Sequence, residues 1–286
     1  MSFPSWTLLA QSVLSGVFAG ALYGLLGLGL GLSWGLLRTI NLAHFAFAFL
    51  SAYLCWQLSV VGRMDPLLTL AAIVPLMFAL GAGLHWLTDR FRLTPFSSLL
   101  LTFGCMGIVE SLMQTVWTAD PRKLESRYAD MKLRLGPLYL PAPELLTLGL
   151  AVAVSLAAWA VLRHTDLGKA LRASAEDAPV AAAFGVNQRL NGFLLAGLCA
   201  ALAGVAGVCI ALSGSISPSQ MYTWVGVVFA AVMLGGLGSA LGPLVAGVVI
   251  GVSEAVTMAV TSPSWAPLVS FTLLIAILLV RPGRVR

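Results

Sequence analysis

Long apolar stretches recur along this chain, each close to the length that a helix needs to cross a lipid bilayer. A membrane-spanning helix takes roughly 20 predominantly apolar residues. Stretches of this kind cover residues 8–33, 43–61, 66–87, 95–118, 143–162, 191–213, 222–236, 241–260 and 265–280. Backbone polar groups must find partners inside lipid, so these stretches form helices or breaks that other protein segments cover. We therefore predict an all-α fold, a polytopic transmembrane helical bundle of about nine spans.

Two connections leave the number of spans open between about eight and ten. Residues 61–66 allow only a very short turn. Residues 235–243 carry four glycines and a proline, which break a helix. This break lies either inside the membrane or in a surface loop.

Composition supports the assignment to a membrane. Charged residues are only 9% of the chain and hydrophobic residues are 59%, whereas a soluble domain carries roughly 25% charged residues. The net charge of +5 comes from Lys and Arg scattered among short connections, which is typical of cations beside membrane spans and not of a nucleic-acid surface. The cysteines Cys55, Cys105, Cys199 and Cys209 lie in apolar stretches without a Cys-x-x-Cys pair, so we expect packing residues and no metal site.

The N-terminal stretch and one missing motif narrow the interpretation further. The first apolar stretch exceeds a signal-peptide core and has no basic segment before it, so an uncleaved helix is expected. The chain contains no G-x-x-x-x-G-K-[ST] loop for nucleotide phosphates. Energy from ATP would therefore have to come from a partner.

Lys and Arg residues predict the orientation. With the N-terminus outside and the C-terminus inside, ten of them lie on the inner side, including Arg281, Arg284 and Arg286, and six on the outer side. An excess of basic residues marks the cytoplasmic side. Residues 119–142 are then a periplasmic loop and residues 163–190 a cytoplasmic loop, and neither is long enough to be an independent domain.

The inner loop has a helix-sized segment of small residues. Ser174 or Asp177 is suited to cap a short helix, Pro179 to its first turn and Gly185 to its end. Such a helix would offer a smooth surface to a partner. The alternative is an ordinary connector between two spans.

Glycines are expected to bring helices close together. The pairs Gly20–Gly24, Gly31–Gly35 and Gly247–Gly251 each have the spacing that allows helix backbones to approach. The break at residues 235–243 has a different expected role, because freed backbone groups at membrane depth commonly line solute paths.

Polar residues inside the apolar stretches are the remaining candidates. Glu110 and Glu254 either act in a solute path or bond to a neighbouring helix. Asn41 and His44 lie at the inner end of the first helical hairpin, where a structural hydrogen bond is the simpler role for the His. The candidates for a solute path or its helix breaks are Asn41, His44, Glu110, Gly235, Gly236, Gly238, Ser239 and Glu254.

An ordered set of motifs resembles a known family over nearly the whole chain. Residues 38–44 (RTINLAH), 232–239 (VMLGGLGS) and 251–254 (GVSE) resemble signature segments of the H-type (LivH-type) permease subunits of branched-chain amino acid ABC importers. Residues 167–187 resemble the loop by which such permeases dock on their ATPase. The resemblance implies ATPase contacts from Lys169, Arg172, Ala175, Glu176, Asp177, Ala182, Gly185 and Asn187. One departure is Phe45, which stands where the family usually has Gly.

The resemblance also implies an assembly in the bacterial inner membrane. Residues 1–286 would form one permease domain, paired with a second, homologous permease, two cytoplasmic ATPase subunits and a periplasmic solute-binding protein. No cofactor and no catalytic residue is expected in this chain. The solute would be a branched-chain amino acid or a related small molecule.

Two other function classes stay open on the residues alone. A self-contained, proton-coupled transporter would use Glu110 or Glu254 as the proton carrier. An intramembrane serine enzyme would need a His at the depth of Ser213, Ser215 or Ser217, and none is found there.

Overall fold

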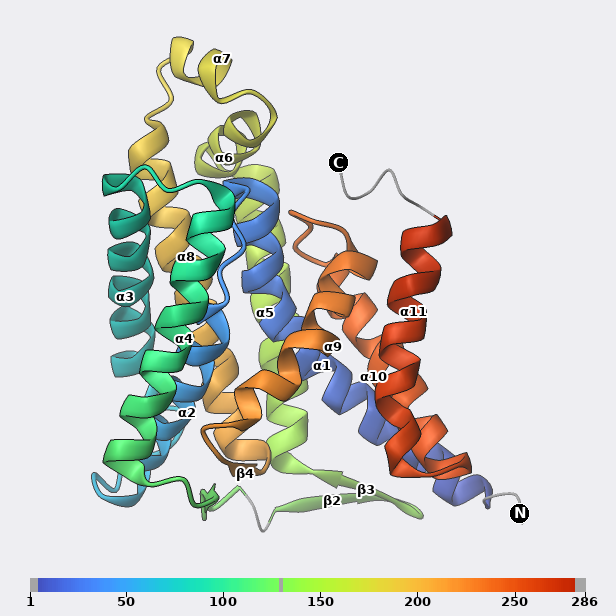
Figure 1. The fold of residues 1–286 in the computed structure, drawn as a ribbon. Coiled ribbons are helices and arrows are strands. Elements are labelled where there is room, and N and C mark those ends of the chain that lie inside the picture. The colour runs from blue at the N-terminus through green and yellow to red at the C-terminus, as the bar shows by residue number, and fades with distance from the viewer. Residues whose placement is uncertain (1–4, 129–130, 281–286) are drawn as a thin grey trace.

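The computed structural model describes residues 5–128 and 131–280 and shows a bundle of helices (Figure 1). The basic residues Arg281, Arg284 and Arg286 lie outside the described residues. The helices are α1 (Trp6–Leu37), α2 (Ala43–Val60), α3 (Leu70–Arg90), α4 (Pro95–Trp117), α5 (Ala142–His164), α6 (Asp166–Glu176), α7 (Ala178–Ala183), α8 (Gln188–Ser213), α9 (Gln220–Gly235), α10 (Gly242–Val260) and α11 (Ala266–Val280), with a 3₁₀ turn η1 (Pro263–Trp265). The short strands are β1 (Arg122–Lys123), β2 (Lys132–Leu135), β3 (Leu138–Pro141) and β4 (Ser215–Ile216).

The helices confirm the prediction of a polytopic helical bundle. Seven described helices are long and apolar enough to cross a membrane by length and composition: α1, α2, α3, α4, α5, α8 and α10. The shorter apolar helices α9 and α11 correspond to the two remaining apolar stretches. The number of crossings and the orientation stay predictions.

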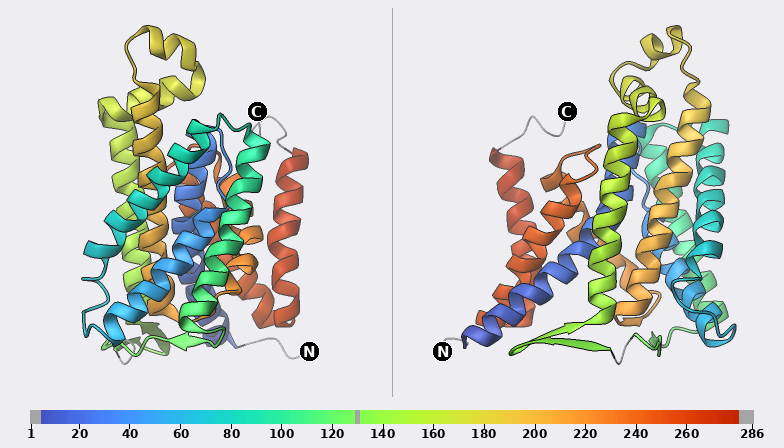
Figure 2. Two further views of the ribbon diagram at one scale, coloured as in Figure 1. Left: turned by 60° about the vertical axis from the view of Figure 1, so that its left-hand side comes forward. Right: turned by 180° about the vertical axis from the view of Figure 1, so that it is seen from behind.

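The two polar loops predicted from the sequence lie at opposite ends of the bundle. Helices α6 and α7 project from one end, and the β2–β3 hairpin lies at the other end, near the start of α1 (Figures 1 and 2). This arrangement is what loops on opposite sides of a membrane require.

Residues 119–142 differ from the plain loop that the sequence predicted. Strands β2 and β3 pair antiparallel, with Leu135 opposite Leu138. The turn between them uses Gly136 at a φ of 60°, a conformation that glycine adopts without strain. Strand β1 pairs with β4, which lies far along the chain just before α9. The bundle therefore has a small β-structured cap at this end.

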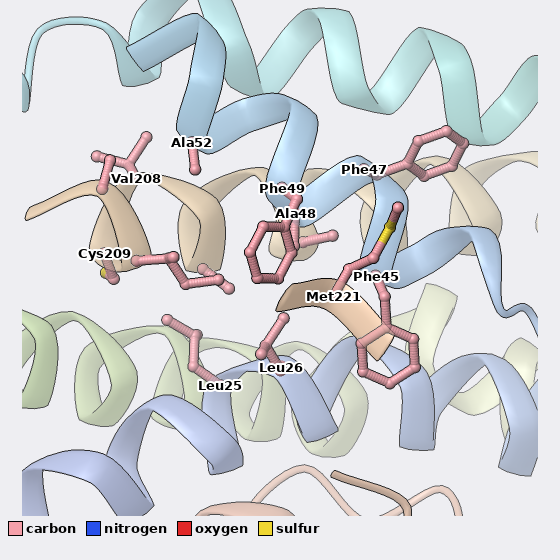
Figure 3. Close-up of a cluster of buried hydrophobic side chains, with 14 of the residues drawn as sticks. Leu25, Leu26, Phe45, Phe47, Ala48, Phe49, Ala52, Val208, Cys209 and Met221 are labelled. Carbon is pink, nitrogen blue, oxygen red and sulfur yellow. The ribbon is translucent and has the colours of Figure 1, made fainter. Parts of the chain in front are cut away.

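The core lies where α1, α2, α8 and α9 meet (Figure 3). Leu25 and Leu26 of α1 pack with Phe45 and Phe49 of α2, and all four side chains are fully buried. Phe45, the departure from the family pattern, is therefore a core residue. Its bulk is accommodated by hydrophobic packing.

Helices α1 and α10 pack backbone to backbone along a glycine seam. A Cβ built on Gly16 would lie 2.6 Å from the Cα of Val252, and one built on Gly24 would lie 2.5 Å from the Cα of Leu244. A Cβ on Gly20 would overlap the carbonyl oxygen of Gly247, and one on Gly247 would overlap that of Gly20. The close approach predicted from the Gly20–Gly24 and Gly247–Gly251 spacings is confirmed, and the structure identifies the two helices as partners.

Candidate functional site

The connection between α5 and α8 folds into two helices where the sequence predicted one. Asp177 caps α7, because its carboxylate accepts a hydrogen bond of 3.1 Å from the backbone N–H of Val180. Pro179 lies in the first turn of α7, and Gly185 follows its end at a φ of 87°. These expectations are confirmed. Ser174 is not a cap, because it lies inside α6 and its hydroxyl donates to the carbonyl of Ala170.

The α6–α7 hairpin presents an exposed surface beyond the bundle. Of the residues expected to contact an ATPase, Ala175 is partly buried and the others are exposed: Lys169, Arg172, Glu176, Asp177, Ala182, Gly185 and Asn187. Sequence reasoning missed the two apolar side chains there, Val180 at 50% exposure and Phe184 at 85%. A bulky aromatic among alanines was the available signal. Exposed apolar side chains grouped in this way indicate a binding surface.

Charge on α6 is paired locally. The Lys169 ammonium lies 2.9 Å from the Asp166 carboxylate, three residues earlier. This hydrogen bond and the charge of Lys169 lower the pKa of Asp166. Both side chains are exposed, so the pair contributes little to stability.

Arg38 connects the α6–α7 hairpin to α1. Arg38 ends α1 in a left-handed conformation with a φ of 55°. Its guanidinium donates a hydrogen bond of 2.6 Å to the carbonyl oxygen of Ala175, in the last turn of α6. Leu171 of α6 is buried in the same cluster as Leu32 of α1 and Ala240 of the α9–α10 connection. Three elements thus meet at this end of the molecule.

The α9–α10 connection, residues 236–241, lies at this same end and contacts α1 (Figure 1). The backbone N–H of Gly238, at a φ of 74°, donates 3.0 Å to the carbonyl oxygen of Gly31. A Cβ on Gly35 would overlap the Gly238 nitrogen, whereas one on Gly31 would meet Val232 and Pro243 only at ordinary contact distances, so the close approach predicted from the Gly31–Gly35 spacing holds at Gly35 alone. The Ser239 hydroxyl accepts a hydrogen bond of 3.0 Å from the N–H of Gly242, the first residue of α10.

Gly235 and Gly236 have different roles in this connection. A Cβ on Gly235 would overlap the backbone of Gly242, so this position is a close approach. No described atom lies within 4 Å of a Cβ built on Gly236, so this position is not a point of close approach among the described residues. Gly236 instead supplies a φ of 91° and a ψ of 134°, a combination that L residues avoid.

Glu254 and His44 match the structural alternative considered for each. The buried carboxylate of Glu254 on α10 accepts hydrogen bonds from the Tyr23 hydroxyl of α1, at 3.1 Å, and from the Ser270 hydroxyl of α11. His44 is buried, and its Nε2 lies 3.0 Å from the carbonyl oxygen of Leu26. Each group therefore joins neighbouring helices.

Asn41 borders a small polar cavity of about 20 Å³, which is large enough for one water molecule. His85, Thr88, Ser98 and Thr102 also line it. The side-chain oxygen of Asn41 is buried without a hydrogen-bond partner among the described residues. A water in the cavity would satisfy this oxygen and link the start of α2 to α3 and α4.

Glu110 lies apart from these residues, on α4. Its carboxylate accepts a hydrogen bond of 2.7 Å from the Tyr222 hydroxyl of α9 and one of 3.1 Å from the Gln114 side chain. Helix α4 packs mainly on α2, whereas α10 packs on α1, so Glu110 and Glu254 are not brought together. In the described part of the chain no three His, Cys, Asp or Glu side chains cluster as a metal site requires.

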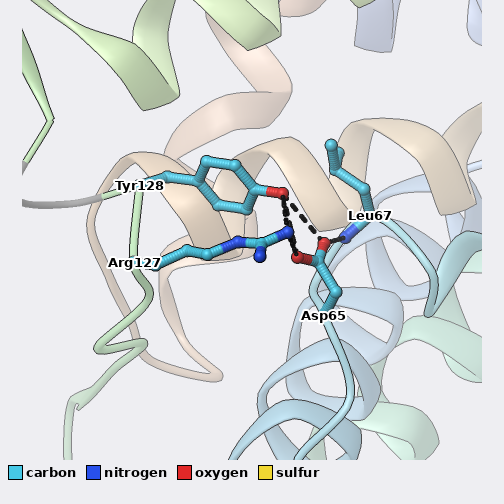
Figure 4. A network of polar contacts seen from close by, with 4 residues as sticks. All are labelled: Asp65, Leu67, Arg127 and Tyr128. Carbon is cyan, nitrogen blue, oxygen red and sulfur yellow. Dashed lines mark hydrogen bonds and ion pairs between the residues drawn. The ribbon is translucent and has the colours of Figure 1, made fainter.

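A polar network at the hairpin end was not predicted (Figure 4). Asp65 accepts hydrogen bonds from the Arg127 guanidinium, from the Tyr128 hydroxyl and from the backbone N–H of Leu67. The hydrogen bond with Tyr128 and the charge of Asp65 raise the pKa of Arg127. A cavity of about 530 Å³ lies beside the network. The network ties residues 119–142 to the α2–α3 turn, and α3 begins at Leu70, four residues after the predicted start at residue 66.

The fold and these sites define the class of protein: a multi-pass helical membrane protein with an exposed helical hairpin at one end. The chain belongs to the family described as the permease component of the branched-chain amino acid transport system, which it matches over residues 12–278. It is therefore a membrane permease component and a transport protein.

Curated relatives cover most of the chain. The high-affinity branched-chain amino acid transport system permease protein LivH of Salmonella typhimurium is 27% identical, over 95% of this chain and 93% of its own. BraD of Pseudomonas aeruginosa, described by the same words, is 25% identical over 95% and 94%. A probable LivH protein of Methanocaldococcus jannaschii is 26% identical over 90% and 86%. No solved structure matches the chain.

Proposed function

We propose that this chain is the transmembrane permease subunit of an ATP-driven importer of the ABC class in the bacterial inner membrane. Family membership supports this proposal. The printed names of the relatives support branched-chain amino acids or related small solutes as the cargo. Hydrolysis of ATP is assigned to partner subunits.

The observation that carries the proposal is the exposed surface of the α6–α7 hairpin. Val180 and Phe184 project apolar surface beyond the bundle, next to the exposed Ala182. Such a surface is favourable when a protein partner covers it. We assign this partner as a cytoplasmic ATPase, and orient the chain with α6 and α7 in the cytoplasm. The complete assembly would hold two ATPase subunits, a second, homologous permease and a periplasmic solute-binding protein.

Motion of a docked ATPase would reach the membrane through α6. The Arg38–Ala175 hydrogen bond joins α6 to α1, and Leu171 packs against α1 and Ala240. Helix α1 is in turn packed along α10 by the glycine seam. A displacement of α6 would therefore move α1 and residues 236–241 together. Alternating access follows when these elements move relative to the second permease.

The assignments within the membrane follow from the contacts. Gly235, Gly236, Gly238 and Ser239 shape the α9–α10 connection, which we propose as a moving part beside the path. Glu254, His44 and Asn41 hold helices around it. Glu110 differs from these residues, because its side chain is partly exposed at the surface of this chain.

A proton-coupled transporter that acts alone is the second candidate, and the partly exposed Glu110 is the observation that favours it. The energy source separates the two candidates. Uptake of radiolabelled leucine is measured in proteoliposomes that hold either this chain alone, with a proton gradient, or the complete assembly, with ATP inside or absent. We expect uptake only from the complete assembly with ATP, and no ATP hydrolysis by the chain alone. Uptake by the chain alone under a proton gradient would reject the proposal.

A further inference from the structure

Helix α4 has a stripe of small and polar residues that the described part of the chain does not cover, beside exposed apolar side chains such as Phe103 and Ile108. Gly104, Ser111 and Gln114 are exposed. No described atom lies within 4 Å of a Cβ built on Gly104 or Gly107. Polar side chains are unfavourable against hydrocarbon, so this stripe of α4 belongs against water or protein.

Glu110 lies at the edge of this stripe. Its two hydrogen-bond donors, the Tyr222 hydroxyl and the Gln114 amide, are both neutral. Among the described residues, the ion pairs join Arg127 with Asp65, Lys169 with Asp166, and Arg189 with Asp89, so none of them neutralises Glu110. The carboxylate is therefore held in position, and no cation among the described residues pairs with it.

Glu254 provides a contrast within the same molecule. It is buried, and its donors come from two other helices, so its contacts close the packing of α1, α10 and α11. Glu110 is only half-buried, and its partner Tyr222 is 39% exposed. A carboxylate can accept about four hydrogen bonds. Two of these positions on Glu110 stay available on the open side.

We propose that Glu110, oriented by Tyr222 and Gln114, binds the ammonium group of the transported amino acid as it enters from the hairpin end. This assignment rests on the proposed function. Glu110 lies seven residues before the end of α4 at Trp117, which corresponds to roughly 10 Å at 1.5 Å per residue. An ammonium group supplies three N–H donors and the missing positive charge. Gly104 and Gly107 leave space beside it for the rest of the solute.

The first test is uptake of leucine by the complete assembly with ATP, normalised to the amount of assembled permease. We expect Glu110→Gln, which keeps the shape and removes the charge, to lower uptake at limiting leucine at least tenfold. Tyr222→Phe should give a smaller loss, because it removes one donor and leaves the carboxylate. Ser253→Ala on α10 is the control, since the Ser253 hydroxyl donates to the Val249 carbonyl of its own helix and α10 does not pack on α4, and its uptake should equal that of the parent.

The second test has a readout that a purely structural role would not change. Ser111→Cys, in a Cys105→Ala background, is labelled with a small thiol reagent in the complete assembly. Leucine should slow the labelling several-fold when Glu110 is present, and should not slow it in the Glu110→Gln variant. Equal protection in both, or parent-level uptake by Glu110→Gln, would overturn the assignment of Glu110 and leave the proposed function intact. A parent assembly that takes up no amino acid with ATP would overturn both.

Discussion

At the scale of single residues, Gly235 and Gly236 require glycine for different reasons: Gly236 has a positive φ, and Gly235 lies in close contact with another backbone segment. Gly236→Ala forces an L residue to a φ of 91°, and such backbone strain costs on the order of 1–3 kcal/mol. Gly235→Ala adds a methyl group that overlaps the Gly242 backbone, so the connection must shift. We expect both variants to insert normally, to denature at lower temperature in detergent and to lose uptake.

Gly83 is the matched control for these two glycines. It lies within α3, and no described atom is within 4 Å of its added Cβ. Gly83→Ala should keep or raise stability by up to about 1 kcal/mol, because alanine is the better helix former. The account of the α9–α10 connection is contradicted if Gly235→Ala and Gly236→Ala behave like Gly83→Ala.

At the scale of elements, the α1–α10 glycine seam is the most constrained contact. Gly20→Leu would press a side chain into the backbone of Gly247, where no flexible neighbour can move aside. Overpacking typically costs ~1–3 kcal/mol in a core, and backbone contact places this site at the upper end. We expect a clear fall in the midpoint of thermal denaturation in detergent.

Gly149→Leu in α5 supplies the comparison, because no described atom lies within 4 Å of its added Cβ. This variant should denature close to the temperature of the parent. Equal effects of Gly20→Leu and Gly149→Leu would show that the seam is not the tight contact described above.

The elements also show what sequence reasoning can and cannot reach. The length of the apolar stretches sufficed to predict the helices, and Asp177, Pro179 and Gly185 sufficed for the ends of α7, because these signals are local. The pairing of Arg122 with Ile216 could not be predicted, since it joins residues far apart in the chain. Glycine spacing likewise predicted close approach but not that α10 is the partner of α1.

For the candidate site residues, too, the sequence identified the residues but not their contacts with distant parts of the chain. Glu110 and Glu254 are equivalent in sequence as acids within apolar stretches, and only their neighbours separate them. Tyr23 and Ser270 enclose the carboxylate of Glu254, whereas the carboxylate of Glu110 stays partly exposed beside Tyr222. Phe45, the departure from the family pattern, is a core residue.

At the scale of the whole molecule, the account requires the two ends of the bundle to face opposite compartments. A cysteine at the exposed Glu125, near the hairpin end, should react with an impermeant thiol reagent in whole cells. A cysteine at the exposed Asn187, after α7, should react only after the cells are opened. We choose Glu125 because the nearby Tyr128 bonds to Asp65 and its replacement would disturb that network. The reverse labelling pattern would invert the orientation and exclude α6 and α7 as the ATPase contact.

The central claim is that the α6–α7 hairpin transmits the work of a partner ATPase to this permease. It is tested most directly by leucine uptake and ATP hydrolysis measured together in proteoliposomes of the complete assembly, for Ala182→Arg and for Ala119→Arg as control. Both alanines are exposed, and Ala119 lies at the opposite end of the bundle. We predict that Ala182→Arg lowers the leucine taken up per ATP hydrolysed at least tenfold while Ala119→Arg matches the parent. An unchanged ratio for Ala182→Arg would contradict the claim.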